Sequence, residues 1–324
     1  MLEKEIFKIE NAAEFQRLAI EVFRFQYENV RVYRNFCDFL NIKVSEVKTI
    51  EEIPFLPIQF FKSHKVIAEK EPEETIFTSS GTTGSTTSKH YVADLKLYEI
   101  SFLKAFERQY GNPSNFVILA LLPSYLEREG SSLIFMVDKL IELSNNPHSG
   151  FYLFEMDALT EKLDALEKNG QKTLLIGVSY ALLDLIEKGK FQFKNTIVME
   201  TGGMKGRRKE MIKEELHGIL KKGFGVAKIH SEYGMTELLS QAYSTGNGIF
   251  NCPPWMKILT RDTEDALSYT FGKTGGINVI DLANLNSCSF IATQDLGKTY
   301  PDGSFEILGR FDSSDIRGCN LMVF

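Results

Sequence analysis

The chain has 324 residues, of which 43% are hydrophobic, and this content is sufficient for one large domain or two closely packed ones. The formal net charge is −6 and the 37 basic residues are scattered, which argues against nucleic-acid binding. No apolar stretch approaches the roughly 18 residues that a membrane span needs, and the charged N-terminus does not resemble a signal peptide. Four widely spaced cysteines without a zinc-binding pattern favour a cytoplasmic protein with reduced thiols.

The first part of the chain is expected to be helical. Apolar residues recur at helical spacing from Glu14 to Asn29, and an aromatic-rich pattern continues from Val30 to Leu40. We therefore predict that residues 1–74 form a helical N-terminal region, which packs on a main domain.

Short apolar strands and helices alternate through the main domain, which we place at residues 75–310. We expect strands at Glu74–Thr78, Asn115–Leu122, Thr173–Val178, Thr196–Met199 and Val226–Ile229, and helices at Leu95–Tyr110, Ser131–Leu143, Ala181–Lys188 and Arg208–Lys221. This alternation predicts an α/β fold with a mostly parallel sheet flanked by helices. Ligands of such sheets bind at the carboxyl ends of the strands, so the segments that follow them are candidate site residues.

The C-terminal part has a different pattern, with strands separated by Gly, Asn and Asp-Gly turns. We expect these strands at Gly276–Asp281, Ser289–Thr293 and Ser304–Leu308, with a hairpin turn at Asp302-Gly303. The pattern predicts an antiparallel or barrel-like region. Residues 311–324 are then a short hinge or tail.

A loop rich in hydroxyl groups follows the first predicted strand. Eight of the ten residues from Ser79 to Ser88 are Ser or Thr, and the other two are glycines. Glycines let a backbone approach a polyphosphate, while amides and hydroxyls donate hydrogen bonds; Lys89 adds a cation. The alternative is a flexible surface loop. Neither a Walker A motif nor a dinucleotide-binding fingerprint is present, because the GK-T segments near Lys273 and Lys298 lack the first glycine.

Four motifs in the same order resemble the adenylate-forming superfamily, which includes acyl-CoA synthetases, phenylacetate-CoA ligases and firefly luciferase. They are the loop Thr78-Ser79-Ser80-Gly81-Thr82-Thr83-Gly84, the turn Thr201-Gly202-Gly203, the segment Tyr233-Gly234-Met235-Thr236-Glu237, and Thr293-Gln294-Asp295 with Asp302-Gly303 and Gly309-Arg310. Residues 122–128, 231–243 and 316–320 further resemble the acyl-protein synthetases, the fatty-acid ligases of bacterial luminescence. This narrower resemblance covers almost the whole chain.

The resemblance implies ATP-dependent activation of a carboxylic acid, with a fatty acid as the expected substrate. It implies that Thr78, Ser79, Ser80, Gly81, Thr82, Thr83, Gly84 and Lys89 bind phosphates, that Gly202, Gly203, Tyr233 and Gly234 bind adenine, and that Asp295 and Arg310 bind the ribose or a phosphate. Thr236 would contact the α-phosphate. Glu237 would bind Mg²⁺, a hard ion that prefers carboxylate, phosphate and water oxygens. The alternatives are structural: Tyr233 as a core aromatic, Glu237 as a helix-start carboxylate, and Asp295 and Arg310 as turn residues.

Cys319 is the expected acyl acceptor. In acyl-protein synthetases a cysteine near the C-terminus receives the acyl group and passes it to a reductase partner, and Cys319 stands at that place. Thiolates are good acyl acceptors, although a free cysteine is often only a small core residue. The other cysteines, Cys37, Cys252 and Cys288, are expected to pack in the core.

Two departures from the superfamily pattern stand out. Gln294 replaces a glycine, so its turn is expected to avoid a glycine-only conformation. The sequence ends at Phe324, so the mobile domain that supplies a catalytic lysine in larger members is expected to be absent. The candidate replacements for that cation are Lys205, Lys89 or a partner protein.

Several questions stay open at this point. The acceptor could instead be coenzyme A or an acyl carrier protein, and a non-catalytic scaffold that binds nucleotide is a third possibility. Candidate walls of the acyl pocket are Tyr125, Leu126 and the residues after Val178. His230 is a weaker candidate for the same pocket, with a structural role favoured.

Overall fold

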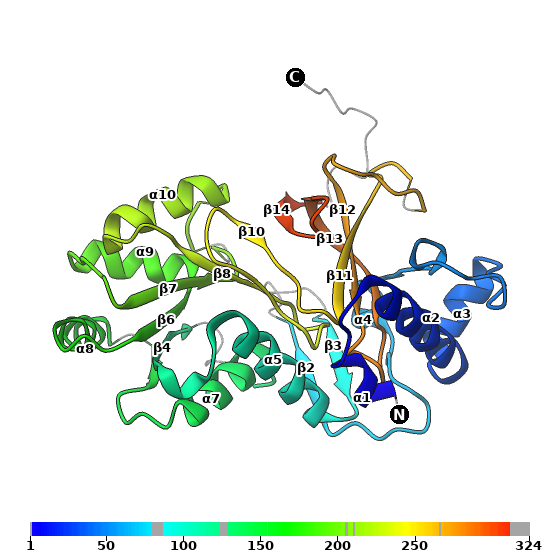
Figure 1. Cartoon of the computed structure of the whole chain (residues 1–324), viewed down its shortest axis with the longest axis horizontal. Helices are drawn as coiled ribbons and strands as arrows, with labels where there is room; N and C mark the ends of the chain where they lie inside the picture. The colour runs from blue at the N-terminus through cyan, green and yellow to red at the C-terminus, as the bar shows by residue number, and fades with distance from the viewer. Residues whose placement is uncertain are drawn as a thin grey trace.

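The structure, a computed structural model, describes residues 2–79, 87–123, 129–153, 155–204, 207–209, 211–265 and 267–311. Figure 1 shows two sheets next to each other, with the N-terminal helices beside the second one. Buried side chains from the N-terminal region and from both sheets belong to one hydrophobic cluster. Within the part of the chain that is described, no helix is long and apolar enough to cross a membrane.

The first sheet is mostly parallel, as expected. Its strand order is β5 (Gly150–Tyr152), β4 (Val117–Leu121), β6 (Thr173–Val178), β7 (Thr196–Thr201), β8 (His230–Tyr233) and β9 (Ala242–Ser244), and only β9 runs antiparallel to its neighbour. Strands β4 and β6 are buried along their whole length. Central parallel strands need this apolar composition because helices cover both faces of the sheet.

Five long helices accompany this sheet: α5 (Leu95–Tyr110), α7 (Ser132–Ser144), α8 (Met156–Lys168), α9 (Ser179–Lys188) and α10 (Lys213–Phe224). Helix α9 packs against both α8 and α10, and Figure 1 shows these three along the outer side of the sheet. The short 3₁₀ turn η2 (Pro113–Asn115) leads from α5 into β4.

The second sheet is antiparallel and confirms the pattern expected for the C-terminal part. Its order is β10 (Ile249–Phe250), β14 (Phe305–Arg310), β13 (Phe290–Thr299), β12 (Gly275–Asp281) and β11 (Met256–Arg261). The predicted hairpin joins β13 to β14, with Gly303 in the left-handed region at φ 85°. A glycine is suited to this turn because a Cβ disfavours positive φ.

The N-terminal region contains α1 (Leu2–Ile6), α2 (Ala12–Asn29), α3 (Arg31–Phe39), the 3₁₀ turn η1 (Ile50–Glu52) and α4 (Phe60–Ser63). The Asn11 side chain caps α2 by accepting a hydrogen bond from the Glu14 amide. One face of α2 is buried, and each fully buried large apolar side chain contributes about 1.5–3 kcal/mol. Short strand β1 (Leu56–Pro57) then pairs in parallel with β13, which attaches this region to the second sheet.

The loop predicted to bind phosphate does not leave the parallel sheet. It follows β2 (Thr75–Thr78), which pairs only with β3 (Lys89–Val92) in a separate two-stranded antiparallel sheet among the described residues. The prediction that the strand before this loop belongs to the parallel sheet is therefore wrong. Residues 80–86, which include Ser80, Gly81, Thr82, Thr83 and Gly84, lie outside the described residues.

The strand predicted at Val226–Ile229 is also wrong. Gly225 ends α10 in the left-handed conformation, and the amide of Val226 bonds back to the Lys221 carbonyl, so Val226 belongs to the helix end. Strand β8 begins only at His230. Of this segment only Ile229 is buried, whereas Ala227 and Lys228 are exposed, so the apolar residues do not form a buried strand.

Two further predictions need correction. Helix α10 begins five residues later than expected, because Arg208 instead bonds Asp184 and Glu187 of α9. The turn expected at Thr293-Gln294-Asp295 is part of strand β13, where Asp295 pairs with Arg310 of β14. An extended strand suits any residue, so Gln294 needs no glycine-like conformation.

Candidate active site

Three of the predicted nucleotide-binding residues are joined directly. The Tyr233 hydroxyl donates to Asp295 Oδ2 at 2.8 Å, and Arg310 Nε donates to Asp295 Oδ1 at 3.0 Å. Tyr233 ends strand β8 of the first sheet, whereas Asp295 and Arg310 lie side by side in β13 and β14 of the second. The contact therefore joins the two sheets at the proposed site.

Asp295 can accept further hydrogen bonds. A carboxylate has about four lone-pair positions, and this one uses a position on each oxygen for its protein partners. The Tyr233 ring also packs edge-on against Phe250 and Phe305, with centroid distances of 5.9 and 5.4 Å. Tyr233 is thus both a core aromatic and a positioning group for Asp295.

Glu237 is a buried carboxylate, with 5% of its surface exposed. Burial raises its pKa, while a hydrogen bond from Ser88 and the charges of Arg310 and Lys62 act in the opposite direction. Ser88 in turn forms a reciprocal pair with Ser79, because the Ser79 amide donates to the Ser88 carbonyl and the Ser88 amide donates to Ser79 Oγ. The base of the hydroxyl-rich loop is thereby linked to Glu237.

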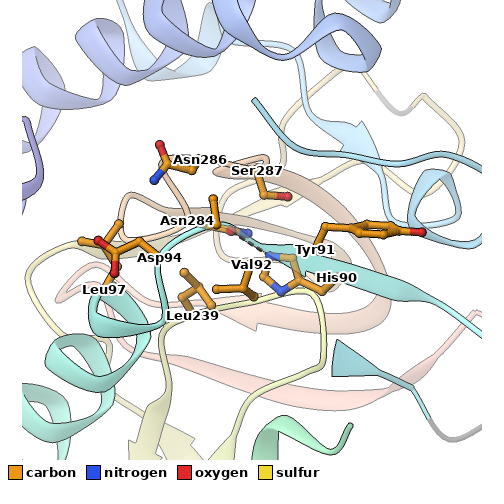
Figure 2. A pocket seen from close by; sticks show the side chains of 10 residues that line it. His90, Tyr91, Val92, Asp94, Leu97, Leu239, Asn284, Asn286 and Ser287 are labelled. Atoms are coloured by element: carbon orange, nitrogen blue, oxygen red, sulfur yellow. Dashed lines mark hydrogen bonds between the residues drawn. The ribbon is translucent and has the colours of Figure 1, made fainter. Parts of the chain in front are cut away.

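The main chain of Thr236 and Glu237 is held by a His-Asn pair, which Figure 2 shows in place. His90 Nδ1 lies 2.8 Å from the Thr236 carbonyl, and His90 Nε2 lies 3.0 Å from Asn284 Oδ1. The Asn284 amide nitrogen donates to the carbonyls of Glu237 and Cys288 at 2.8 and 2.9 Å. Burial lowers the pKa of His90 to about 4, although both ring hydrogen bonds raise it.

The turn after β7 is tied to β8 through side chains. Thr201 Oγ1 donates to Glu232 Oε2 at 2.5 Å, and Ser179 Oγ donates to the Gly202 carbonyl at 3.2 Å. Gly202 has φ 67°, and the space around the Cα of Gly203 is open. Both glycines thus lie at the carboxyl edge of the parallel sheet, as predicted, on a turn with room for an approaching ligand.

Two buried carboxyl groups, those of Glu200 and Glu232, lie at the same edge of the parallel sheet and differ in pKa. Burial raises the pKa of Glu232 to about 7, against a smaller opposing effect of the Thr201 hydrogen bond. Burial also raises the pKa of Glu200, but the charge of Lys213 and a hydrogen bond from His217 outweigh it and bring the value to about 2. The Lys213 ammonium is therefore already paired with Glu200, at 2.6 Å.

Thr78 and Lys89 pair at the end of the β2–β3 hairpin from which the hydroxyl-rich loop leaves. The Thr78 amide donates to the Gly130 carbonyl at 2.8 Å, and the Lys89 side chain is exposed. Of the residues after Val178, which were predicted to line the acyl pocket, Ser179 is buried and polar, whereas Ala181 and Leu182 are buried and apolar. Tyr125, Leu126 and Lys205 lie outside the described residues.

The cysteines behave as predicted where they are described. Cys37 and Cys288 are buried, and Cys252 is half-buried. Burial raises the pKa of Cys37 to about 12, which makes its thiol unreactive. Cys319, the expected acyl acceptor, lies outside the described residues. His230 Nδ1 lies 3.1 Å from the Tyr110 hydroxyl, which favours a structural role for this histidine.

Sequence reasoning missed Ser88, His90, Asn284 and Lys62. Ser88 ends the run of hydroxyl residues that begins at Ser79. Phosphate binding was predicted for that loop, with no separate role for Ser88. His90 and Asn284 are separated by 194 residues, and no local pattern links them. Lys62 belongs to the predicted helical N-terminal region, outside every motif segment.

The residues present fit magnesium that arrives with a nucleotide. Among the described residues, no three His, Cys, Asp or Glu side chains gather to form a metal site. Mg²⁺ usually binds through one or two carboxylates together with phosphates and water. A single buried carboxylate with a raised pKa, such as Glu237, matches that arrangement because a bound cation would stabilise its ionised form.

Comparison with known proteins agrees with this geometry. The family model described as acyl-protein synthetase, LuxE, matches residues 6–105. The long-chain-fatty-acid–luciferin-component ligase of Aliivibrio fischeri is 25% identical over 95% of this chain and 87% of its own length. The chain is related to the acyl-protein synthetases. The ligase of the same name from Vibrio harveyi is 24% identical over 95% of this chain and 86% of its own length, so the relatives found carry the name of the expected class, a ligase.

Similarity to solved structures confirms the predicted fold of this chain. The open conformation of 2-hydroxyisobutyryl-CoA ligase, in complex with 2-HIB-AMP and CoA, has a TM-score of 0.69 at 15% identity, over 94% of this chain and 72% of that one. ATP-bound MatB from Rhodopseudomonas palustris has a TM-score of 0.55 at 18% identity. The match covers 72% of this chain and 47% of MatB, so the chain spans about half the length of that protein.

Proposed function

We propose that this protein activates a carboxylic acid, with a fatty acid as the preferred substrate, by forming an acyl-adenylate from ATP. The observation that carries the proposal is the joining of the separate motifs: Tyr233 to Asp295 and Arg310, and Ser79 through Ser88 to Glu237. Residues that are far apart in the sequence thereby surround one region with donors, a carboxylate and a cation. The ligase names of the relatives support the same activity.

In the first step, a carboxylate oxygen of the acid attacks the α-phosphorus of ATP. A new phosphorus–oxygen bond forms, the bond to the β-phosphate breaks, and pyrophosphate leaves with its electron pair. Such a transfer needs positioning and charge neutralisation more than covalent catalysis. Magnesium, when bound at Glu237, would supply positive charge to the phosphates.

The protein's own groups would hold the nucleotide. Thr78, Ser79, Ser80, Gly81, Thr82, Thr83, Gly84 and Lys89 would bind its phosphates, and Gly202, Gly203 and Gly234 would leave room for the adenine. Asp295 would accept hydrogen bonds from the ribose hydroxyls with its remaining lone pairs. Arg310 would orient Asp295, and Thr236 would contact the α-phosphate from a turn that His90 and Asn284 hold in position.

In the second step, we propose that the Cys319 thiolate attacks the acyl carbon. A carbon–sulfur bond forms, the carbon–oxygen bond to the phosphate breaks, and AMP leaves; the thiol proton has passed to solvent. The resulting thioester keeps the acyl group reactive for a reductase partner. The place of Cys319, where the acyl-protein synthetases that the chain resembles have their acceptor cysteine, supports this acceptor, whereas coenzyme A or an acyl carrier protein is the alternative acceptor.

The test of activation is carboxylate-dependent ATP–pyrophosphate exchange, measured with a panel of acids and magnesium. Exchange with one class of acid is expected, and its absence for every acid would favour the scaffold alternative. The test of transfer is hydroxylamine-labile labelling of the protein by a labelled fatty acid. Cys319→Ser is expected to abolish the label, while Cys252→Ser serves as the control and is expected to retain it. Acceleration of AMP release by free coenzyme A would instead identify coenzyme A as the acceptor.

A further inference from the structure

A short segment of the N-terminal region lies close to the proposed phosphate site. Strand β1 pairs with β13, Leu56 opposite Ile291 and Pro57 opposite Ala292, and the Ile58 amide donates to the Ala292 carbonyl at 3.0 Å. Strand β13 is the strand that carries Asp295. The chain then enters helix α4 directly, so α4 begins at a fixed place relative to the second sheet.

The other side of α4 is fixed by the His-Asn pair. Phe61 is buried, and its ring stands edge-on to the His90 ring at a centroid distance of 5.7 Å. His90 bonds the Thr236 carbonyl at 2.8 Å. Two successive side-chain contacts therefore connect α4 to the turn that carries Thr236 and Glu237.

Lys62 follows Phe61 in α4 and presents a cation from this anchored helix. Its side chain is exposed, and it forms no ion pair with any of the described residues. Its charge nevertheless acts on the Glu237 carboxyl, as does the charge of Arg310. Lys62 and Arg310 thus place positive charge near Glu237 from opposite ends of the sequence.

Lys65, three residues further on and beyond the end of α4, has a different role. Its ammonium forms an ion pair with Glu73 at 2.7 Å and lies 5.1 Å from the centre of the Tyr91 ring. It is therefore engaged on the surface of the β2–β3 hairpin. This pair of nearby lysines, one engaged and one without an ion-pair partner in the described chain, offers a matched comparison.

We propose that Lys62 is a phosphate-binding residue of the active site, whose ammonium contacts the phosphates of ATP next to Glu237. This role rests on the proposed function, and it extends the site to the N-terminal region. Phosphoryl transfer develops negative charge that fixed cations stabilise. A lysine on an anchored segment of backbone suits this task because its ammonium acts as a compact point charge on phosphate oxygens. Lys62 would thus supply the cation for which Lys205 and Lys89 are the candidates from sequence.

The experiment compares Lys62→Met, Lys62→Arg and Lys65→Met in carboxylate-dependent ATP–pyrophosphate exchange. Lys62→Met is expected to lower kcat/KM for ATP by about tenfold or more, consistent with the loss of a charged contact to phosphate. Lys62→Arg keeps the charge and is expected to remain within about threefold of wild type. Lys65→Met is expected to equal wild type, and the KM for the acid is expected to stay constant in all three variants.

A structural role would give a different pattern. If Lys62 only stabilised α4, Lys62→Met would lower the Tm and would weaken the acid and ATP steps together. Wild-type kcat/KM for ATP in Lys62→Met would overturn the inference while leaving the proposed function intact. If wild type itself shows no exchange with any acid, the proposed function fails, and MgATP binding by calorimetry then decides on Lys62. Equal Kd values for wild type and Lys62→Met, or no binding by either, would overturn its role.

Discussion

The Tyr233 hydroxyl donates to one oxygen of Asp295, and this contact joins the end of a parallel strand to the middle of an antiparallel one. The distance is 2.8 Å, and both side chains are buried. Arg310 bonds the other oxygen from an exposed position, so the carboxylate is oriented from both sides. The same bond therefore helps to orient Asp295 and links the two sheets.

Replacing Tyr233 by Phe should remove the hydrogen bond between the Tyr233 hydroxyl and Asp295 while keeping the aromatic ring. The ring still packs, but Asp295 Oδ2 loses its buried donor, which is expected to cost about 1–3 kcal/mol of unfolding free energy. Urea unfolding measures this loss. Tyr300→Phe is the control, because Tyr300 donates to Glu306 near the surface at the same 2.8 Å. Equal unfolding free energies for both variants would show that the buried Tyr233 hydrogen bond stabilises the fold no more than the Tyr300 hydrogen bond does.

The variant Glu237→Gln is expected to lower activity without lowering stability. Removing the carboxylate is expected to lower magnesium-dependent exchange by about 100-fold or more, because a positioned charge is lost at the phosphates. The Tm is expected to remain at or above that of wild type, since burial disfavours the ionised form that Gln replaces. Exchange rates across a magnesium titration, combined with calorimetric melting, measure both. A variant with a wild-type magnesium requirement would exclude Glu237 as the metal ligand.

Glu232 predicts a specific dependence of stability on pH. Burial raises its pKa in the folded protein to about 7, above the value of 4.5 for an unperturbed glutamate. The folded state therefore keeps a proton that the unfolded state releases, and stability is lost as the pH rises from 4.5 through 7. The shift corresponds to about 3 kcal/mol at full effect. Urea unfolding of wild type and Glu232→Gln from about pH 5 to pH 8 should show the variant gaining relative stability; parallel curves would contradict this.

Asn284 gives a test of how the Thr236–Glu237 turn is held. Asn284→Asp keeps the shape but removes the amide that donates to the Glu237 and Cys288 carbonyls, at an expected cost of about 2–4 kcal/mol. The exchange rate should fall as well, because the turn loses its support. Asn286→Asp is the control, since Asn286 lines the same small cavity at a less buried position. Similar losses in both variants would point to added charge rather than to the missing donor.

The local patterns of the sequence predict the elements well where apolar spacing is regular. The bounds of α5 and β6 agree with the prediction at both ends, because each segment has one clear period and a clear stop. The pairing of β1 with β13 could not be predicted, since two residues carry no periodicity. His90 was likewise assigned no role, because its partners Thr236 and Asn284 are 146 and 194 residues away. The motif residues were found through family resemblance, whereas the groups that support them were not.

The attachment of α2 also bears on how the chain is made. Gln26 donates to Ser289 Oγ across 263 residues and accepts from the Ser289 amide, and β1 completes its pairing with the same part of the chain. Gln26 therefore leaves the ribosome well before its partners around Ser289 have been synthesised. Because contacts so distant in sequence form late and slowly, the part of α2 around Gln26 stays uncovered until residues 284–289 have been synthesised, and exposed surface of this kind is what chaperones bind during translation.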